Sequence, residues 1–292
     1  MKQLVLHCGA LGFRFSALLL GALLSLSNAF AEADFHPDVA AGLVRVQGRE
    51  VWEQNAEDRL PQASLTKIMT AVLILEKYQP DAVVKISKTA AAAFPTKIGL
   101  RAGDRILLKD LLAATLVHSA NDACRALAEW HSDTEDEFVE KMNARAVQMG
   151  LRDTHFANAC GFDAPDHYST ARDVAVLAEI AMQNRTFRQM VNREKMTIRT
   201  VDGKRKFMFN TTNKLLGKYD GATGVKTGFT FKAGPCLVAM SKRNDVKVMI
   251  VMLNARNRWP NARQMFDLAF QEARKPRQER IASAPLSSST SL

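Results

Sequence analysis

The chain has few of the residues that mark several classes of small domain. Its 292 residues include four cysteines, three tryptophans and three tyrosines, and aromatic side chains make up 7% of the total. Four cysteines are too few for a small fold stapled by several disulfides, and their spacing fits neither a zinc finger nor another metal site. The aromatic-rich motifs of RNA-binding domains are also missing. These absences exclude disulfide-rich mini-proteins, zinc-finger proteins and the common RNA-binding modules.

Long apolar runs are confined to the N-terminal region. Residues 15–26 form such a run after the positive charges of Lys2 and Arg14, and an A-x-A arrangement follows that ends at Ala31. The run is shorter than the roughly 20 residues that span a bilayer, which argues against an uncleaved membrane anchor. We therefore predict a signal peptide over residues 1–31. The protein should be exported, to the periplasm or another extracytoplasmic space, and keep no transmembrane segment after cleavage.

The chain is basic, with a formal net charge of +10. Such a balance can attract a protein to anionic lipids, nucleic acids or acidic wall polymers. The basic residues are scattered, however, apart from residues 204–206 and a few near the C-terminus. We therefore favour a solvated basic surface and expect no nucleic-acid partner.

Three cysteines, Cys124, Cys160 and Cys236, remain once the predicted signal peptide is removed. An odd number in an oxidising compartment leaves at least one thiol unpaired or paired elsewhere. One disulfide is compatible with the sequence, which does not say which two cysteines form it. Small buried side chains are the default interpretation for all three, although Cys124 lies one helical turn after Asn121 and so near a candidate site residue.

Strand patterns occupy both ends of the chain, and helix patterns fill its middle. This order predicts an α+β fold in which one antiparallel sheet uses both chain ends and a helical segment is inserted between them. It also predicts one domain over residues 32–275 and a polar, disordered tail over residues 276–292. Strands are expected at residues 42–46, 50–54, 197–200, 206–209, 224–230, 236–241 and 246–253, and helices at residues 65–78, 109–117, 121–130, 134–149, 170–183 and 260–273.

Ser64 and Lys67 lie three residues apart at the start of a predicted helix. Side chains with this spacing are neighbours on a helix, so the Lys67 amine can reach the Ser64 hydroxyl. A serine hydroxyl becomes nucleophilic when a base takes its proton. A lysine can be that base if burial or a second cation lowers its pKa. The pair is a weak signal by itself, because Ser-x-x-Lys is frequent on helix surfaces.

Two further segments strengthen this interpretation. Ser119-Ala120-Asn121 precedes a predicted helix, and Lys226-Thr227-Gly228 lies in a strand-like run. A second lysine near Lys67 would help to keep it neutral or would hold an anionic group of a substrate, and the glycine would let a ligand backbone lie close. The three motifs occur in the order found in penicillin-binding proteins and class A β-lactamases. Each has the required context, which is a helix start, a turn before a helix, and a strand.

With these motifs the chain resembles the low-molecular-mass penicillin-binding proteins that are serine-type D-Ala-D-Ala carboxypeptidases, peptidase family S11. The similarity extends over roughly residues 42–270 and includes LPQASLTKIMTA, SANDACRALAE and GVKTGFTFKAGPCLVAMSKRN. The resemblance implies a β-lactamase/transpeptidase-like fold of the α+β type. In this fold helices flank a five-stranded antiparallel sheet and a helical subdomain is inserted. It also implies chemistry that uses no cofactor and no metal ion.

The resemblance implies a role for each motif residue. Ser64 would attack the carbonyl between the two D-alanines of a peptidoglycan stem peptide and form an acyl-enzyme. Lys67 would be the general base, and Ser119 would relay a proton to the leaving amine. β-Lactam antibiotics would acylate the same serine, and the backbone N–H groups of Ser64 and Phe229 would form the oxyanion hole. The substrate-binding residues would be Asn121, Lys226, Thr227, Gly228 and Phe229.

Some features separate the chain from β-lactamases. The second motif is Ser-Ala-Asn, and no glutamate lies between Thr154 and Thr170 to serve as a deacylation base. Asp163 and Asp166 lie in this loop, where solvated carboxylates are the default interpretation. We therefore expect a slowly decaying penicillin adduct. The alternatives are a DD-endopeptidase that cuts cross-links on the same scaffold and a catalytically inactive wall-binding protein.

Other residues near the motifs receive structural interpretations. His118 precedes Ser119, but a Ser/Lys mechanism needs no histidine. Arg256 and Arg258 follow the last predicted strand and are interpreted as surface charges, with help in holding a carboxylate as the alternative. The chain also stops before the β-rich C-terminal domain and anchor helix of many relatives, so we expect no membrane attachment through its C-terminus.

Overall fold

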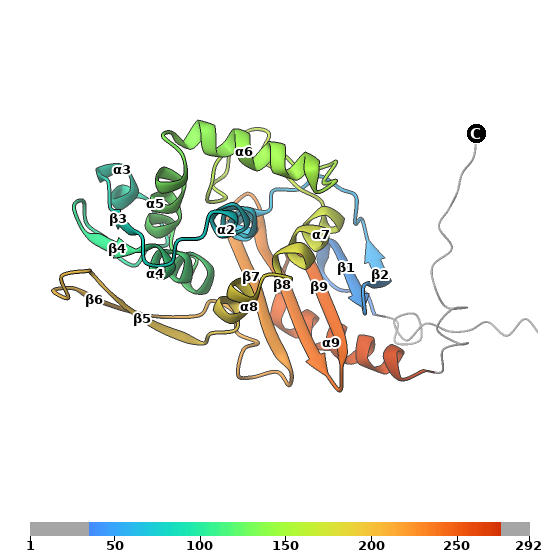
Figure 1. Cartoon of the computed structure of the whole chain (residues 1–292). Helices are drawn as coiled ribbons and strands as arrows, with labels where there is room; N and C mark the ends of the chain where they lie inside the picture. The colour runs from blue at the N-terminus through green and yellow to red at the C-terminus, as the bar shows by residue number, and fades with distance from the viewer. Residues whose placement is uncertain (1–34, 276–292) are drawn as a thin grey trace, which may run out of the picture.

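Both ends of the described chain contribute to one antiparallel sheet. The computed structural model describes residues 35–275, so the predicted signal peptide and tail lie outside the described residues. The strand order is β2-β1-β9-β8-β7, which confirms the predicted five-stranded antiparallel sheet and the α+β class (Figure 1). The strands are β1 (Val39–Val46), β2 (Arg49–Gln54), β7 (Ala222–Thr230), β8 (Gly234–Arg243) and β9 (Val246–Ala255).

The central strands are apolar because both faces of the sheet are covered. Leu43 of β1 lies opposite Val251 of β9, which lies opposite Val238 of β8. These three side chains are buried in the larger of two core clusters, on the side of the helical segment. Lys226 of β7 is the next residue in this row, opposite Val238. Since residues directly opposite one another share a face of the sheet, the strand register directs Lys226 toward the helices.

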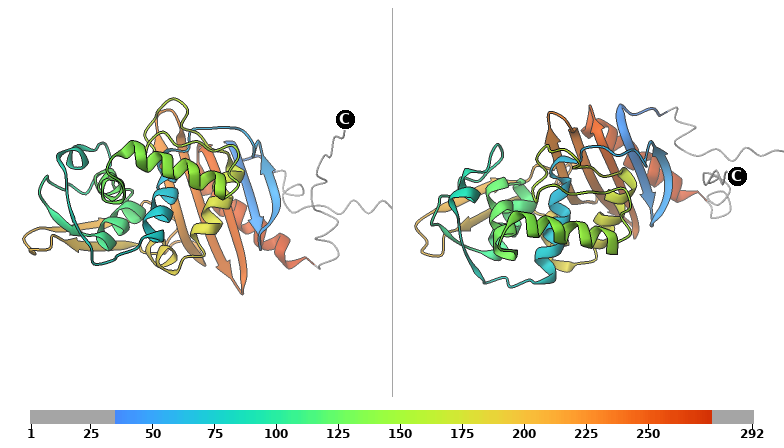
Figure 2. Two further views of the ribbon diagram at one scale, coloured as in Figure 1. Left: turned by 45° about the horizontal axis from the view of Figure 1, so that its top comes forward. Right: turned by 90° about the horizontal axis from the view of Figure 1, so that it is seen from above.

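Helices cover the two faces unequally. The C-terminal helix α9 (Arg258–Arg274) packs on one face, where Phe266 is buried and stacks on Tyr219. On the opposite face lie α2 (Lys67–Glu76) and α7 (Ala171–Ala181), as the two views in Figure 2 show. Eight consecutive residues of α2, from Lys67 to Ile74, are buried. A helix that is buried all round forms part of the core, so the first turn of α2 is held firmly.

The helical segment extends beyond the edge of the sheet beside β7 (Figure 1). Its later helices begin at side-chain caps, which satisfy backbone N–H groups at a helix start. Thr134 caps α6 and Thr170 caps α7. No helix within residues 35–275 is long and apolar enough to cross a bilayer. The remaining elements are β3 (Val83–Lys85), α3 (Lys88–Ala92), β4 (Arg105–Leu107), α4 (Leu108–Ala113), α5 (Asn121–His131), α6 (Glu135–Gln148) and α8 (Arg185–Val191).

The local predictions hold for the long elements and miss several of the short ones. The helix expected from residue 65 begins as a 3-10 turn, η1 (Ala63–Thr66), before α2. The hairpin expected around residue 203 forms a separate two-stranded ribbon of β5 (Lys195–Arg199) and β6 (Lys206–Asn210). Four short elements, β3, α3, β4 and α8, were not predicted, because three to seven residues are too few to show a period.

Candidate active site

Ser64 lies in the 3-10 turn that leads into α2, between two close backbone contacts. Ala63 has a left-handed φ of 48°, an uncommon conformation for a residue with a side chain. A Cβ atom at Gly228 of β7 would lie 3.0 Å from the Gln62 carbonyl oxygen and 3.2 Å from the Ser64 nitrogen. A Cβ atom at Gly161 would overlap the Ala63 carbonyl oxygen. Glycine at these two positions therefore lets two segments pack directly against the backbone of the predicted nucleophile.

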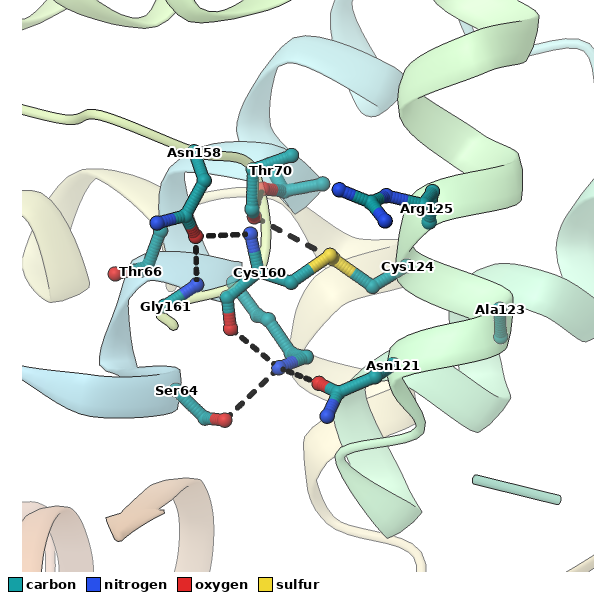
Figure 3. Close-up of a disulfide and its surroundings, with 12 residues drawn as sticks. Ser64, Thr66, Thr70, Asn121, Ala123, Cys124, Arg125, Asn158, Cys160 and Gly161 are labelled. Carbon is teal, nitrogen blue, oxygen red and sulfur yellow. Dashed lines mark hydrogen bonds between the residues drawn. A yellow bond between two sulfur atoms is a disulfide. The ribbon is translucent and has the colours of Figure 1, made fainter. Parts of the chain in front are cut away.

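The amine of Lys67 lies at the centre of the site. Its side chain is fully buried. Lys67 Nζ lies 2.8 Å from Ser64 Oγ, 2.8 Å from Asn121 Oδ1 and 2.5 Å from the Cys160 carbonyl oxygen. Figure 3 shows Ser64, Asn121 and Cys160 converging on one point from three different elements. The structure thus brings together the predicted pair of nucleophile and base, and it adds the Cys160 carbonyl, which the sequence had not indicated.

These contacts make the Lys67 amine suitable as a base. Burial, followed by the positive charge of Lys226, lowers the pKa of Lys67 well below its ordinary value of 10.5. A neutral amine has two N–H groups and one lone pair. The oxygens of Cys160 and the Asn121 amide can only accept hydrogen bonds, so they use both N–H groups. The lone pair then faces the Ser64 hydroxyl, which can donate its proton to it.

Ser119 and Lys226 form a second hydrogen-bonded pair. A short π-helix, η2 (Ala114–His118), ends at Ser119, whose φ of 63° is left-handed. This sharp turn places Ser119 and Asn121, two residues apart, on the same site. Lys226 Nζ donates to Ser119 Oγ at 2.8 Å and to the Thr227 carbonyl oxygen at 2.8 Å. Burial, followed by the charge of Arg258, lowers the pKa of Lys226 to about 7.

The interpretation of Arg258 as a surface charge is wrong. Its Nη1 atom donates to the carbonyl oxygens of Gly228, at 2.8 Å, and Cys236, at 3.0 Å. It therefore joins β7 to β8 directly behind the third motif. Burial lowers the pKa of Arg258, and its charge acts on Lys226. Arg256, two residues earlier, is exposed as expected.

β7, which carries the third motif, is an edge strand of the sheet. β7 is the last strand of the sheet, and the backbone of such an edge strand can pair with an added peptide. The Thr227 hydroxyl lies 2.6 Å from that of Thr212. The Phe229 side chain is 56% exposed and makes an edge-to-face contact with Phe231. Of the predicted substrate-binding residues, only Phe229 therefore has its side chain on the surface.

The default interpretation of all three cysteines as small buried side chains is wrong for two of them. Cys124 of α5 and Cys160 form a disulfide with a Cα–Cα distance of 6.0 Å, so they are not simply small buried side chains. Cys236 is free and buried, as expected for the unpaired member of an odd number of cysteines. The sequence allowed one disulfide, but nothing in the segment between its two partners, which are 36 positions apart, indicates the pairing.

The remaining candidates have structural contacts. Asp163 is exposed and accepts a hydrogen bond from the Thr230 hydroxyl at 2.7 Å. His118 is half-buried, and its Nδ1 lies 3.1 Å from the Asn210 carbonyl oxygen. Sequence reasoning missed His167, which is buried and lies 2.7 Å from the Thr66 hydroxyl. Burial lowers the pKa of His167 to about 4, so it supports the first motif as a neutral ring.

The fold and the site together define an active-site-serine acyl-transfer enzyme of the β-lactamase/transpeptidase-like class. A family model described as D-alanyl-D-alanine carboxypeptidase matches residues 37–257. The chain therefore belongs to the D-alanyl-D-alanine carboxypeptidase family of serine hydrolases, which confirms the family and the enzyme class indicated by its motifs.

Individual relatives agree with this assignment. The chain is 34% identical to D-alanyl-D-alanine carboxypeptidase DacF of Bacillus subtilis over 88% of this chain and 70% of that protein. It is 33% identical to DacC of Escherichia coli over 75% of this chain, and the match spans 55% of DacC. The crystal structure of the Streptomyces K15 DD-transpeptidase superposes with a TM-score of 0.77 at 30% identity, over 81% of this chain and 98% of that one.

Because burial lowers the pKa of the Lys226 amine, we predict that the stability of the folded protein depends on pH. Its pKa is about 7 in the folded protein and 10.5 ordinarily, so the unfolded chain binds the extra proton between these values. Stability should therefore rise with pH across this window and stop rising above it. Relative to Lys226→Met, we expect the unfolding free energy of the wild type to rise by about 1 kcal/mol per pH unit. Chemical denaturation at several pH values measures this difference, and parallel curves for the two proteins would contradict it.

Proposed function

We propose that this protein removes the terminal D-alanine from peptidoglycan stem peptides through an acyl-enzyme on Ser64. The observation that carries the proposal is the contact between Ser64 Oγ and the buried amine of Lys67, at 2.8 Å. Two fixed carbonyl acceptors direct the lone pair of that amine at the hydroxyl. Such an arrangement activates a serine without a histidine.

In the proposed first step, Ser64 Oγ attacks the carbonyl carbon between the two D-alanines and passes its proton to Lys67. The oxyanion forms next to the backbone N–H groups of Ser64 and Phe229, which would stabilise its charge. The bond to the leaving amine then breaks as that amine takes up a proton. Lys67 would give up the proton that it took from Ser64, and Ser119, which accepts a hydrogen bond from the Lys226 amine, would relay it to the leaving amine. Water subsequently releases the acyl group and restores Ser64.

The third motif would hold the substrate's terminal carboxylate. Lys226 and Thr227 lie side by side on the strand next to Ser64, and Arg258 adds positive charge behind them. The exposed edge of β7 would pair with the substrate backbone, and Asn121 would hydrogen-bond its amide. A free carboxylate at this position fits a carboxypeptidase. The alternative of an endopeptidase shares the nucleophile and is distinguished by its products.

We further propose that the protein acts outside the cytoplasmic membrane. The charged, apolar and small-residue segments of residues 1–31 support export. The Cys124–Cys160 disulfide provides independent support, because disulfides persist in oxidising compartments. Peptidoglycan, the proposed substrate, is outside that membrane as well.

Labelling with a fluorescent penicillin tests the nucleophile. We expect the wild type to form a covalent adduct that survives denaturation and decays slowly. Labelling of Ser64→Ala should fall by at least about 1000-fold, because no other hydroxyl within residues 35–275 hydrogen-bonds to the Lys67 amine. Ser132→Ala, at the far end of α5 from Asn121, serves as the control and should label normally. Undiminished labelling of Ser64→Ala, or fast repeated hydrolysis of penicillin, would contradict the assignment.

Product analysis tests the reaction. Incubation with pentapeptide-bearing wall fragments should release one D-alanine per stem, and mass spectrometry should show the matching loss. Ser64→Ala is the inactive control. Conversion of cross-linked dimers to monomers without loss of a terminal alanine would identify an endopeptidase.

If the signal peptide is cleaved during export, the mature protein should have a single, defined N-terminus. N-terminal sequencing of the protein secreted by a cell that expresses the full chain should begin at Glu32, after Ala31. Retention of residues 1–31 in the active protein would show that the segment is not a cleaved signal.

A further inference from the structure

We propose that the Cys124–Cys160 disulfide is a positioning element of the active site, which keeps the two carbonyl acceptors of Lys67 at a fixed separation. One acceptor is the carbonyl of Cys160 itself. The other is the side-chain amide of Asn121, one helical turn before Cys124 on α5. Figure 3 shows the disulfide bridging α5 to the loop directly beside these two acceptors. The inference rests on the proposed function, because it assigns the disulfide a part in activating Ser64.

The loop that carries Cys160 is anchored to α2 by contacts other than the disulfide. Thr70 of α2 donates to the Ala159 carbonyl oxygen at 2.5 Å. Asn158 Oδ1 accepts hydrogen bonds from the backbone N–H groups of Cys160, Gly161 and Phe162 at 2.7 to 3.2 Å. These contacts keep the loop folded and close to the helix of Lys67, and none of them reaches α5.

The disulfide supplies the covalent link from this loop to α5. A parallel, non-covalent route runs from Arg125 of α5 to Glu135 at 2.5 Å, and from Glu135 to the Ala159 nitrogen at 3.2 Å. Arg125 and Glu135 are each about one quarter exposed, so water competes for that ion pair. Cys124 and Cys160 are buried. Loss of the disulfide should therefore leave the domain folded but allow α5 and the loop to shift relative to each other.

Such a shift acts directly on the base. The two carbonyl acceptors use both N–H groups of the neutral Lys67 amine, and this fixes where its lone pair points. If Asn121 Oδ1 and the Cys160 oxygen move apart, the lone pair no longer faces Ser64 Oγ. Misplacement of a reacting group by about 1 Å can cost roughly 100-fold in rate. Water entering the gap would also raise the pKa of Lys67, because burial is the main cause of its depression.

The test compares the pH profile of acylation by a fluorescent penicillin in the wild type and in the double variant Cys124→Ser/Cys160→Ser. We expect the maximal rate constant to fall between about 10-fold and 100-fold, and the acid limb of the profile to move to higher pH. Cys236→Ala is the matched control, because it removes the free buried cysteine without touching the disulfide. Its profile should overlay that of the wild type.

A purely structural role predicts a different result. If the double variant melts at a lower temperature but its folded fraction acylates with the wild-type profile, the proposal is wrong. If the wild type itself forms no adduct on Ser64, the proposed function fails, which is a separate outcome.

Reduction of the folded wild type covers the case in which the double variant does not fold. Dithiothreitol gives two electrons and two protons to the disulfide, which becomes two thiols while the reagent closes to its own cyclic disulfide. Acylation should slow on reduction and recover on reoxidation, and Cys236→Ala should behave identically. An unchanged rate in protein shown by thiol titration to be fully reduced would overturn the proposal.

Discussion

The active site depends on the burial of one lysine amine, that of Lys67, away from water. An ammonium group buried without a carboxylate is expensive, and a lysine in such a place lowers its pKa and loses its proton. In the described part of the chain the hydrogen-bond partners of Lys67 are a hydroxyl and two carbonyl oxygens, none of them a carboxylate, and a second buried lysine, Lys226, adds to the effect. A lowered pKa of this kind is what a lysine needs if it is to act as the base for Ser64. Asn121 and the Cys160 carbonyl then fix the direction of this amine.

That requirement explains why the site lies between the sheet and the helical segment. Ser64 comes from the 3-10 turn η1, Lys67 from the start of α2, the acceptor amide from α5, and the second lysine from β7. The junction of these elements buries both amines, while Ser64 stays partly exposed. Two glycines, Gly161 and Gly228, permit the close approach that this junction needs. Burial of lysines costs stability below their ordinary pKa values, and the extensive apolar cores on both faces of the sheet offset that cost.

Much of this arrangement was predictable from local patterns, for reasons that can be stated residue by residue. The spacing of Ser64 and Lys67 needs only helix geometry, and the apolar runs of β8 and β9 identify buried strands. The order of the three motifs predicted which side chains would meet. Arg258 was interpreted as a surface charge because a charged residue after a strand is usually solvated. Its two carbonyl partners lie on β7 and β8, and the sequence alone could not show that these strands lie next to Arg258. The Cys124–Cys160 pairing was also left open, because the sequence alone could not show that these two cysteines lie next to each other.

The sequence by itself determined the class of fold and the family, and it predicted Ser64 as nucleophile and Lys67 as base, because these inferences follow from residue types at short, fixed spacings. Only the tertiary structure decided what surrounds the Lys67 amine. A backbone carbonyl such as that of Cys160 has no signature among residue types, and the disulfide joins segments 36 residues apart. Burial is the main cause of the lowered pKa values of both lysines. It depends on all the side chains that pack around each amine, so it cannot be read from any single residue of the sequence.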